Sequence, residues 1–283
     1  MQEVASARVQ SAYTAEQAVT SRGIAAALGL RSGDVIPPGS LRKIRPYVER
    51  SQKNLAGITH TELNAVLTET RAESISAMRA VVAVYERAES TPLDDPRVQA
   101  RMASVQTMPG GTPREFLVRA TQRIASDIQD VIRRGIVREH TVGETLGNVD
   151  AMLEGSWWRI DRIARTESSY AYSSVADEGV KALAKESPDI GKRWVEHVSD
   201  TTGAPLDNRV ALDSIVMHGQ VTTANGVFTM PNDDRVDARM WGMSWDFPPN
   251  RPNDRSVLEV FSPRWGVPGW EYVVGKRVPI RLR

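Results

Sequence analysis

Residues 157–198 read WWRIDRIARTESSYAYSSVADEGVKALAKESPDIGKRWVEHV, and this stretch decides the fold class. From Trp157 to about Glu186 the pattern is that of a helix, which we expect to end at Ser187-Pro188. Residues 193–198 then alternate between apolar and polar side chains, as strands do. A long helix that leads into a strand predicts an α+β fold.

The half of the chain before this stretch is expected to be helical. Residues 59–62 (THTE) and 112–115 (TPRE) fit the capping box, in which Thr and Glu satisfy backbone N–H groups at a helix start. We therefore expect one helix from Thr59 to Pro92 and a second from Thr112. Residues 141–144 (TVGE) start a third, shorter helix.

The residues after the strand contain short strands, turns and proline-rich loops. Asn225-Gly226, between Val221-Thr222 and Val227-Phe228, is a hairpin signal. We expect a helical N-terminal half followed by a long helix and a small mixed α/β domain. The expected domains are a helical region at 1–155, a mixed domain at 156–262 and a basic, aromatic C-terminal tail at 263–283.

Composition places the chain among ordinary globular proteins, with 41% hydrophobic and 25% charged residues. Its longest apolar run, Ile24–Leu30, is far shorter than the roughly 20 residues of a membrane span, and residues 1–4 lack the features of a secretion signal. We therefore expect no membrane association. The absence of cysteine excludes disulfides and thiolate metal sites, and fits a reducing compartment. With a net charge of +1, any contact with nucleic acid must come from a local patch.

Four short segments follow one another in the C-terminal half. They are 164–167 (ARTE) on the expected helix, 192–194 (KRW) at the expected strand, 207–210 (DNRV), and 248–255 (PPNRPNDR). In this order and spacing they resemble the phage Mu F-like family, which includes the SPP1-type minor head proteins of head morphogenesis. The resemblance covers about residues 157–262.

The resemblance marks a set of motif residues as structural. Four of them, Arg165, Glu167, Asp207 and Arg209, are two acids and two bases, for which we expect a partly buried ion-pair network. A ligand or nucleotide site on the same residues is the alternative. The full set comprises Arg165, Thr166, Glu167, Trp194, Asp207, Arg209, Pro248, Pro249, Asn253 and Arg255.

The sequence departs from the family at positions where many members carry cysteine or histidine. Four such positions would suit a tetrahedral zinc site. Here they are Ala211, Ser214, Asp254 and Ser256, and Arg251 replaces a histidine of the last motif. Because these residues cannot rebuild a thiolate site, we expect no structural zinc and no other cofactor, and a fold that depends on apolar and hydrogen-bonded packing.

The resemblance implies a structural protein of the virion rather than an enzyme. Such a minor capsid protein would bind near the portal vertex in multiple copies and would act in head morphogenesis, genome packaging or DNA ejection. The expected partners are the portal protein and the major capsid protein, with viral double-stranded DNA as a further candidate. The expected location is the capsid interior near the portal, and the host cytoplasm during assembly.

Two basic segments are candidates for contact with DNA or a partner. The first follows a proline-rich loop, and a solvated helix face is its alternative interpretation. In the second, bases alternate with Trp265, Trp270 and Tyr272, and we favour a protein-docking arm with an edge strand over nucleic-acid binding. The candidates are Arg42, Lys43, Arg45, Arg50 and Lys53 in the first segment, and Lys276, Arg277 and Arg281 in the second.

Two other functions remain open. No nucleophile elbow, P-loop, dinucleotide-binding or zinc-protease motif occurs, and the four histidines (His60, His140, His197 and His218) show no metal-ligand spacing. An ADP-ribosyltransferase-like enzyme that uses NAD would draw on Arg165, Ser169 and Glu259, but enzymes of that kind place the arginine on a strand. An ejected DNA-binding virion protein would instead bind duplex DNA with a strong dependence on salt.

Overall fold

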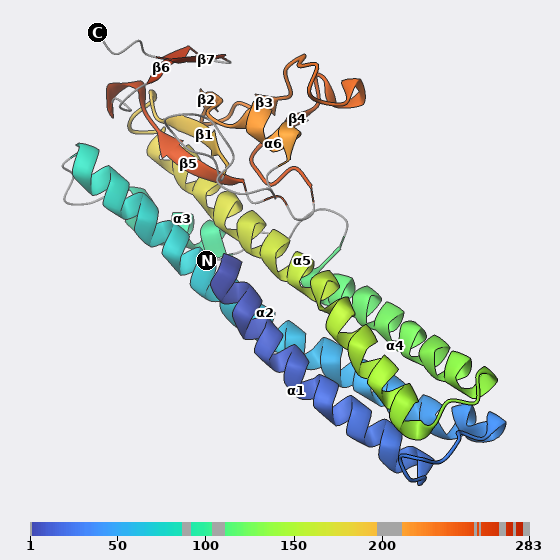
Figure 1. Ribbon diagram of the computed structural model, residues 1–283. Coiled ribbons are helices and arrows are strands. Elements are labelled where there is room, and N and C mark those ends of the chain that lie inside the picture. Colours follow the sequence, from blue (N-terminus) through green and yellow to red (C-terminus); the bar gives the residue numbers. More distant parts are fainter. Residues whose placement is uncertain are drawn as a thin grey trace. The chain divides into compact units, whose positions relative to one another are not determined.

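A computed structural model describes residues 2–86, 92–103, 111–196, 211–251, 254, 256–265, 270–273 and 276–279. The described residues are mostly helical, with short antiparallel strands (Figure 1), which confirms the α+β class. The chain forms two compact units. We call them the helical unit (Met1–Val66 and Pro109–Arg165) and the mixed unit (Leu67–Met108 and Thr166–Arg283).

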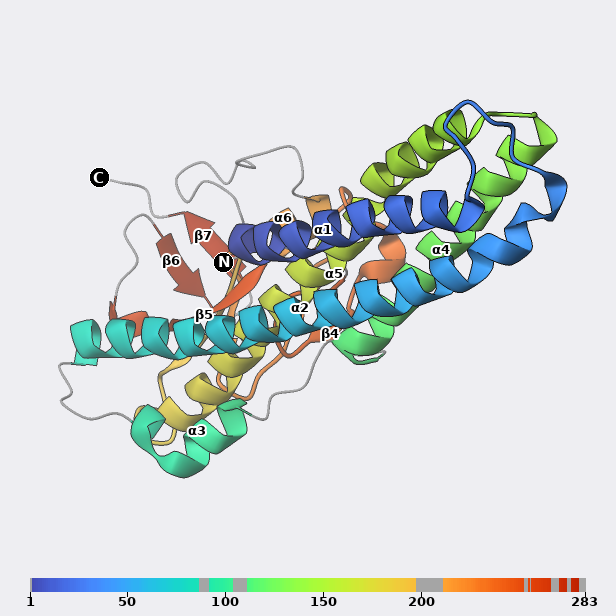
Figure 2. The same cartoon turned by 90° about the horizontal axis from the view of Figure 1, so that it is seen from below.

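The helical unit is built from four helical segments around an apolar interior (Figures 1 and 2). They are α1 (Gln2–Leu28), the first part of α2 (Leu41–Glu86), α4 (Pro113–Val137) and the first part of α5 (Val142–Leu183). A short 3-10 turn, η1 (Pro38–Ser40), precedes α2. Fully buried side chains include Val9, Ile24, Val48, Leu63, Leu117, Ile132 and Ile160.

Two of the expected helix starts are confirmed. At α4, the Glu115 N–H donates to the Thr112 hydroxyl at 3.2 Å and the Thr112 N–H donates to the Glu115 carboxylate at 2.7 Å. At α5, the Glu144 N–H donates to the Thr141 hydroxyl at 3.2 Å and the Thr141 N–H donates to the Glu144 carboxylate at 2.8 Å. Both starts are therefore complete capping boxes.

The expected start at Thr59 is wrong, because α2 begins at Leu41 and runs through it. Thr59 is buried inside the helix, and its hydroxyl donates to the carbonyl oxygen of Leu55 at 2.5 Å. A threonine hydroxyl inside a helix can donate to a carbonyl oxygen of the preceding turn, so the residue type does not by itself mark a helix start. Pro46 does not prevent the earlier start, since it lies near the helix N-terminus, where few backbone bonds are lost.

The two helices expected on either side of Gly155 form one helix, α5, which ends at Leu183. A glycine in a helix costs only about 1 kcal/mol relative to alanine, and tertiary packing offsets this easily. The long helices also explain why the contacts do not divide the chain near residue 155. Two of the three unit boundaries fall inside helices, one in α2 and one in α5, and residues 67–108 group with the C-terminal part.

In the mixed unit, a three-stranded antiparallel sheet has the order β2-β1-β5. The central strand β1 (Gly191–Val195) pairs with β2 (Val221–Thr223) and β5 (Val257–Phe261), with Gly191 opposite Thr223 on one side and Phe261 on the other. This confirms the strand expected around Trp194. The later part of α2, the later part of α5, η2 (Pro92–Asp94) and α3 (Pro96–Ala103) complete the helical portion of this unit.

The hairpin expected at Asn225-Gly226 is wrong. A turn does form there, with the Gly226 N–H donating to the Thr223 carbonyl at 3.0 Å, but the flanking strands do not pair. β2 pairs with β1, whereas β3 (Phe228–Thr229) pairs with β4 (Ser244–Trp245). The remaining elements are α6 (Leu212–Met217), η3 (Ala238–Met240), η4 (Pro263–Trp265) and the paired strands β6 (Trp270–Val273) and β7 (Lys276–Pro279).

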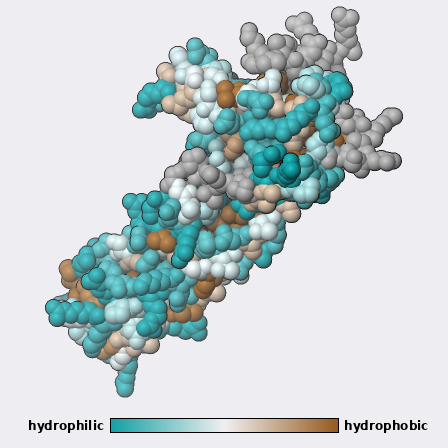
Figure 3. Space-filling model, turned by 180° about the vertical axis from the view of Figure 1, so that it is seen from behind, coloured by the Kyte–Doolittle hydropathy of each residue, from teal (hydrophilic) through white to brown (hydrophobic). Residues whose placement is uncertain are grey.

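The surface shows no large apolar area on the face drawn in Figure 3, where hydrophobic residues form separate small patches among hydrophilic ones. Among the described residues, no helix has the length and hydropathy needed to cross a membrane.

Candidate functional site

The strand motif at 192–194 supplies a buried charge to the mixed unit. The Lys192 ammonium lies 2.8 Å from a carboxylate oxygen of Asp177 on α5 and donates to the backbone carbonyl of Asp246 at 2.8 Å. Lys181 lies 2.6 Å from the other oxygen of Asp177. Burial lowers the pKa of Lys181, but the hydrogen bond and charge of Asp177, with Glu178 beside it, outweigh burial and raise the pKa.

The same motif contributes the central aromatic side chain of the mixed unit. Trp194 is completely buried. Its ring meets that of Phe228 edge to face, with 5.4 Å between centroids, and that of Trp245 at 6.3 Å. β1 therefore directs one polar and one aromatic residue of its motif into the interior, which is the role expected of a motif that specifies a fold.

Three of the four residues that the sequence resemblance compares with cysteine or histidine lie together. They form a buried polar group that we call the Asp254 cluster: Ser214, Asp254 and Ser256. The Ser214 hydroxyl donates to Asp254 at 3.2 Å, and the backbone N–H of Ser256 does so at 3.0 Å. The Ser256 hydroxyl lies 2.7 Å from oxygens of both Asp254 and Glu196. Glu196 in turn donates its N–H to Nδ1 of His218 at 2.9 Å.

Arg251 of the last motif forms an ion pair next to this cluster. Arg251 donates two bonds to Asp213, at 2.7 and 2.9 Å, and a third to the Ser214 hydroxyl at 3.2 Å. Burial lowers the pKa of Arg251, but its bonds to Asp213 and the nearby charges outweigh burial and raise it. Arg251 thus contributes a positive charge that the acids of this region neutralise.

The turn before Arg251 also packs inward. Pro248 and Pro249 are buried and joined by a cis peptide bond. Asn250 donates its backbone N–H to Asp254 at 3.1 Å. The fourth family position, Ala211, precedes α6 and offers no side-chain bond. In the described part of the chain, no three His, Cys, Asp or Glu side chains are grouped to hold a metal ion. The hydrogen bonds of the Asp254 cluster hold the surrounding loops in place.

Two members of the network expected around the helical motif at 164–167, Asp207 and Arg209, lie outside the described residues, so that network stays a prediction. Arg165 donates from Nε to both oxygens of Asp161, each at 2.9 Å, and from its terminal nitrogen to the Ser6 hydroxyl at 3.2 Å, so it ties α5 to α1 within the helical unit. The i, i+4 spacing of Asp161 and Arg165 could have predicted this pair. Thr166 and Glu167 are buried in the mixed unit. The other motif residues, Asp207, Arg209, Asn253 and Arg255, lie outside the described residues, as does His197.

The first basic segment forms the exposed side of the first turns of α2. Arg42, Lys43, Arg45, Arg50 and Lys53 are all exposed, as both interpretations of this segment require. Arg45 pairs with Glu49 at 2.8 Å, and the Arg50 guanidinium lies 5.7 Å from the centre of the Tyr47 ring. In the second basic segment, Lys276 and Arg277 belong to β7. Their side chains, and the whole of Arg281, lie outside the part of the chain that the structure describes.

The residues of the alternative enzyme do not form a recognisable site. Arg165 lies on a helix and is bound to Asp161, whereas an ADP-ribosyltransferase-like site requires it on a strand. Glu259 lies on β5 and pairs with Arg193 at 2.5 Å, and Ser169 is buried on α5.

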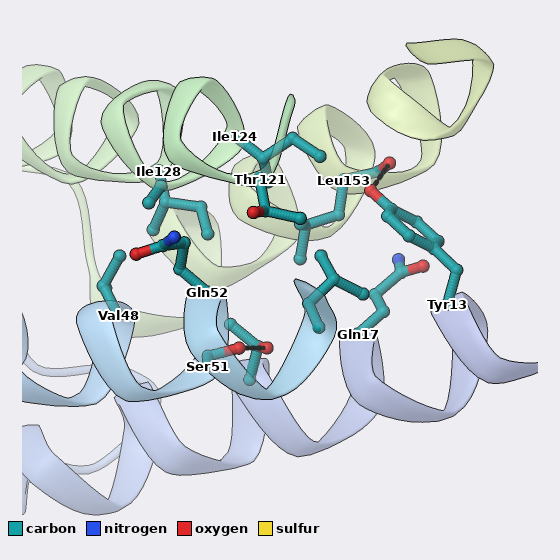
Figure 4. A pocket seen from close by; sticks show the side chains of 12 residues that line it. Tyr13, Gln17, Val48, Ser51, Gln52, Thr121, Ile124, Ile128 and Leu153 are labelled. Carbon is teal, nitrogen blue, oxygen red and sulfur yellow. Dashed lines mark hydrogen bonds between the residues drawn. The ribbon is translucent and has the colours of Figure 1, made fainter. Parts of the chain in front are cut away.

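A pocket of about 280 Å³ lies inside the helical unit (Figure 4), but its enclosed part has room for only about one water molecule. Ile124, Ile128 and Leu153 give it a largely apolar lining. The Tyr13 hydroxyl donates to the Leu153 carbonyl at 2.7 Å, and burial raises the pKa of Tyr13 although the charge of Arg159 opposes it. The pocket is a packing gap rather than a ligand site.

Comparison with known proteins gives no relative: no family model, no curated protein and no solved structure matches the chain.

Proposed function

We propose that the protein is a minor head protein of a bacteriophage, of the Mu F-like kind, which binds at the portal vertex and acts in head morphogenesis, genome packaging or DNA ejection. The observation that carries this proposal is the ordered set of four motifs within residues 157–262. In such a protein the portal and the major capsid protein are the partners, and several copies lie inside the capsid around the portal. Symmetric portals favour this ring arrangement.

The packing of the motif residues supports a structural role. Lys192, Trp194, Pro248 and Pro249 are buried, and Arg165 joins two helices through Asp161 and Ser6. Side chains that hold a fold together in this way suit an assembly protein. A catalytic role would instead favour polar side chains that remain accessible to a substrate.

The helical unit is the natural partner-binding part in this proposal, and Trp158 is its best anchor. This side chain is 51% exposed on α5, and the guanidinium groups of Arg162 and Arg159 lie 5.0 and 5.6 Å from the centre of its ring. Tryptophan and arginine are enriched among the residues that dominate protein–protein binding energies. Truncating Trp158 should therefore weaken partner binding without unfolding the protein.

Co-expression with the portal protein encoded by the same genome tests the proposal. After nuclease treatment, we expect the chain to be retained on tagged portal and to co-elute with it in size-exclusion chromatography. Trp158→Ala should reduce retention, whereas Trp241→Ala, which truncates a tryptophan that is 41% exposed in the mixed unit, should not. Elution of the wild-type chain apart from both portal and major capsid protein would contradict the proposal.

A further inference from the structure

The positive charge of the helical unit is concentrated at one end. By sequence the unit carries 17 lysines and arginines and 13 aspartates and glutamates. The whole excess of four lies in residues 29–53, which carry six bases and two acids; residues 130–144 carry three of each, and the rest of the unit is balanced. The mixed unit, with 19 basic and 22 acidic residues, has the opposite sign. The near-neutral net charge of the chain therefore hides a local basic region.

Two loops form this end of the helical unit and are bonded to each other (Figures 1 and 2). One joins α1 to α2 and the other joins α4 to α5. The Val142 N–H donates to the Asp34 carbonyl and the Gly143 N–H to the Ser32 carbonyl, both at 2.8 Å. Val35 and Thr141 form a β-bridge between them. The two loops thus act as one platform.

Five basic side chains on or beside this platform form what we call the basic tip: Arg31, Arg42, Lys43, Arg134 and Arg138. All five are exposed. No ion pair or side-chain hydrogen bond to another described residue engages any of them, in contrast to Arg45, which pairs with Glu49, and Arg133, which pairs with Asp130. Of the acids in the two loops, Asp34 accepts a bond from the Arg31 N–H and Glu144 is engaged in its capping box. Glu139 is exposed beside Arg138, so the five bases face three acids and the tip keeps a net positive charge.

Helix stability explains only part of this charge. Arg134 and Arg138 lie at the C-terminal end of α4, where positive charge favours the helix dipole. Arg42 and Lys43, by contrast, lie in the first turn of α2, which contains no acidic residue, so the dipole opposes them. Their placement therefore works against the helix and needs a reason outside the fold.

We propose that the basic tip binds the phosphate backbone of duplex DNA. Four of its five bases are arginines, whose guanidinium groups form two parallel bonds with phosphate oxygens. None of the five side chains of the tip is aromatic, and Tyr47, farther along α2, is 41% exposed with the Arg50 guanidinium 5.7 Å from its ring centre, so the tip itself offers charge rather than a row of rings on which the bases of a single strand could stack. A duplex presents a regular, dense line of negative charge that suits a rigid cationic platform. The proposal depends on the helical unit alone and does not require portal binding.

Salt-dependent binding of the full chain to a labelled duplex of mixed sequence, followed by fluorescence anisotropy, tests the proposal. Five phosphate contacts predict a slope of log K against log salt of about −4.5, and so a roughly 500-fold loss of affinity between about 50 and 200 mM NaCl. The variant Arg42→Gln/Lys43→Gln/Arg134→Gln/Arg138→Gln should keep a slope of only about −1 and bind more than about 100-fold more weakly at low salt.

A matched variant controls for net charge. Arg97→Gln/Arg114→Gln/Arg123→Gln/Lys185→Gln removes three arginines and one lysine from exposed positions outside the tip, and should retain nearly the full slope. Equal losses in the two variants would overturn the proposal, because binding would then follow total charge. Failure of the folded wild-type chain to bind duplex DNA would overturn it too, and would direct attention to an acidic protein surface. Portal co-purification is a separate measurement, so either result can fail alone.

Discussion

Lys192 and Asp177 form a buried ion pair in the mixed unit, with 2.8 Å between the ammonium and carboxylate and with 1% and 2% of their side chains exposed. The pair is not symmetric in its surroundings. Asp177 also contacts Lys181 at 2.6 Å, whereas the second partner of Lys192 is the neutral carbonyl of Asp246. One carboxylate therefore serves two ammonium groups, and the loss of the acid should be worse than the loss of either base.

We expect Asp177→Asn to lower the free energy of unfolding by about 3 kcal/mol, because it leaves the Lys192 ammonium buried without a countercharge. Lys192→Met should lower it less, since Asp177 keeps Lys181 and a methionine fills much of the vacated space. Lys185→Met, at an exposed position, should change it by less than about 0.5 kcal/mol. Urea unfolding at neutral pH measures all three. Equal losses for Asp177→Asn and Lys192→Met would contradict this account.

Gly191 lies where β1 and β2 approach too closely for a side chain. A Cβ added there would be 2.3 Å from the carbonyl oxygen of Thr222, and that backbone atom cannot move without separating the strands. Gly191→Ala should therefore destabilise the protein by roughly 1–3 kcal/mol. Gly155 on α5 is the opposite case, because a Cβ added there meets nothing within 4 Å. Gly155→Ala should therefore stabilise the helix by up to about 1 kcal/mol. Thermal unfolding should show shifts of opposite sign.

The features that were predicted correctly have signals confined to a few residues. The capping boxes at Thr112 and Thr141 need only a threonine and a glutamate three positions later, and both were found. Thr59 shows the same pattern but is buried in α2, because packing along 46 residues overrides a local start signal. Asn225-Gly226 forms a turn, yet strand β2 takes its partner from β1, about 30 residues earlier, which no local pattern specifies.

In the candidate site, too, local contacts could be predicted from the sequence and contacts between distant residues could not. The sequence indicated Ser214, Asp254 and Ser256 only as family positions without cysteine. The bond from Ser214 to Asp254 spans 40 residues of chain and could not be anticipated from spacing. The pair of Arg165 with Asp161 is local and was missed because the motif directed attention to Glu167 instead. The basic tip is equally non-local, because its side chains come from two loops that the bridge between Val35 and Thr141 holds together.

Asp254 should be essential to the stability of its cluster. It accepts bonds from the Ser214 hydroxyl and from the backbone N–H groups of Ser256 and Asn250, so Asp254→Ala leaves these buried donors unsatisfied and should cost at least about 2 kcal/mol. Asp234→Ala, which removes an exposed aspartate whose side chain bonds no other described residue, should leave the melting temperature almost unchanged.

Metal removal tests whether hydrogen bonds alone hold this cluster. We expect the melting temperature of the wild-type protein to be the same with and without a strong chelator, because the described residues offer no metal-binding group of three or more ligands. A protein with a structural zinc would be destabilised strongly under the same conditions. A chelator-dependent fall in the melting temperature, with zinc found in the purified protein, would contradict this expectation.

The capping box of α5 should make stability depend on pH in a defined direction. The Thr141 N–H and hydroxyl bond the Glu144 carboxylate and lower its pKa from the ordinary value of 4.5. Because the folded pKa is the lower one, the stabilisation is complete above pH 4.5 and is lost as the pH falls through the folded pKa. Glu144→Gln keeps a side chain that can accept a bond but removes the charge. We expect it to melt below the wild type at pH 7, with the gap closing toward pH 3.

Glu154→Gln removes the same charge from an exposed site on α5 away from the capping box, and so controls for net charge. The wild type and both variants should be melted across the range from neutral to acid pH. If the gap between wild type and Glu144→Gln stays constant at every pH, the capping interaction does not depend on the charge of Glu144. If Glu154→Gln shows the same closing gap, the pH dependence belongs to the charge of the whole helix and not to the bonds from Thr141.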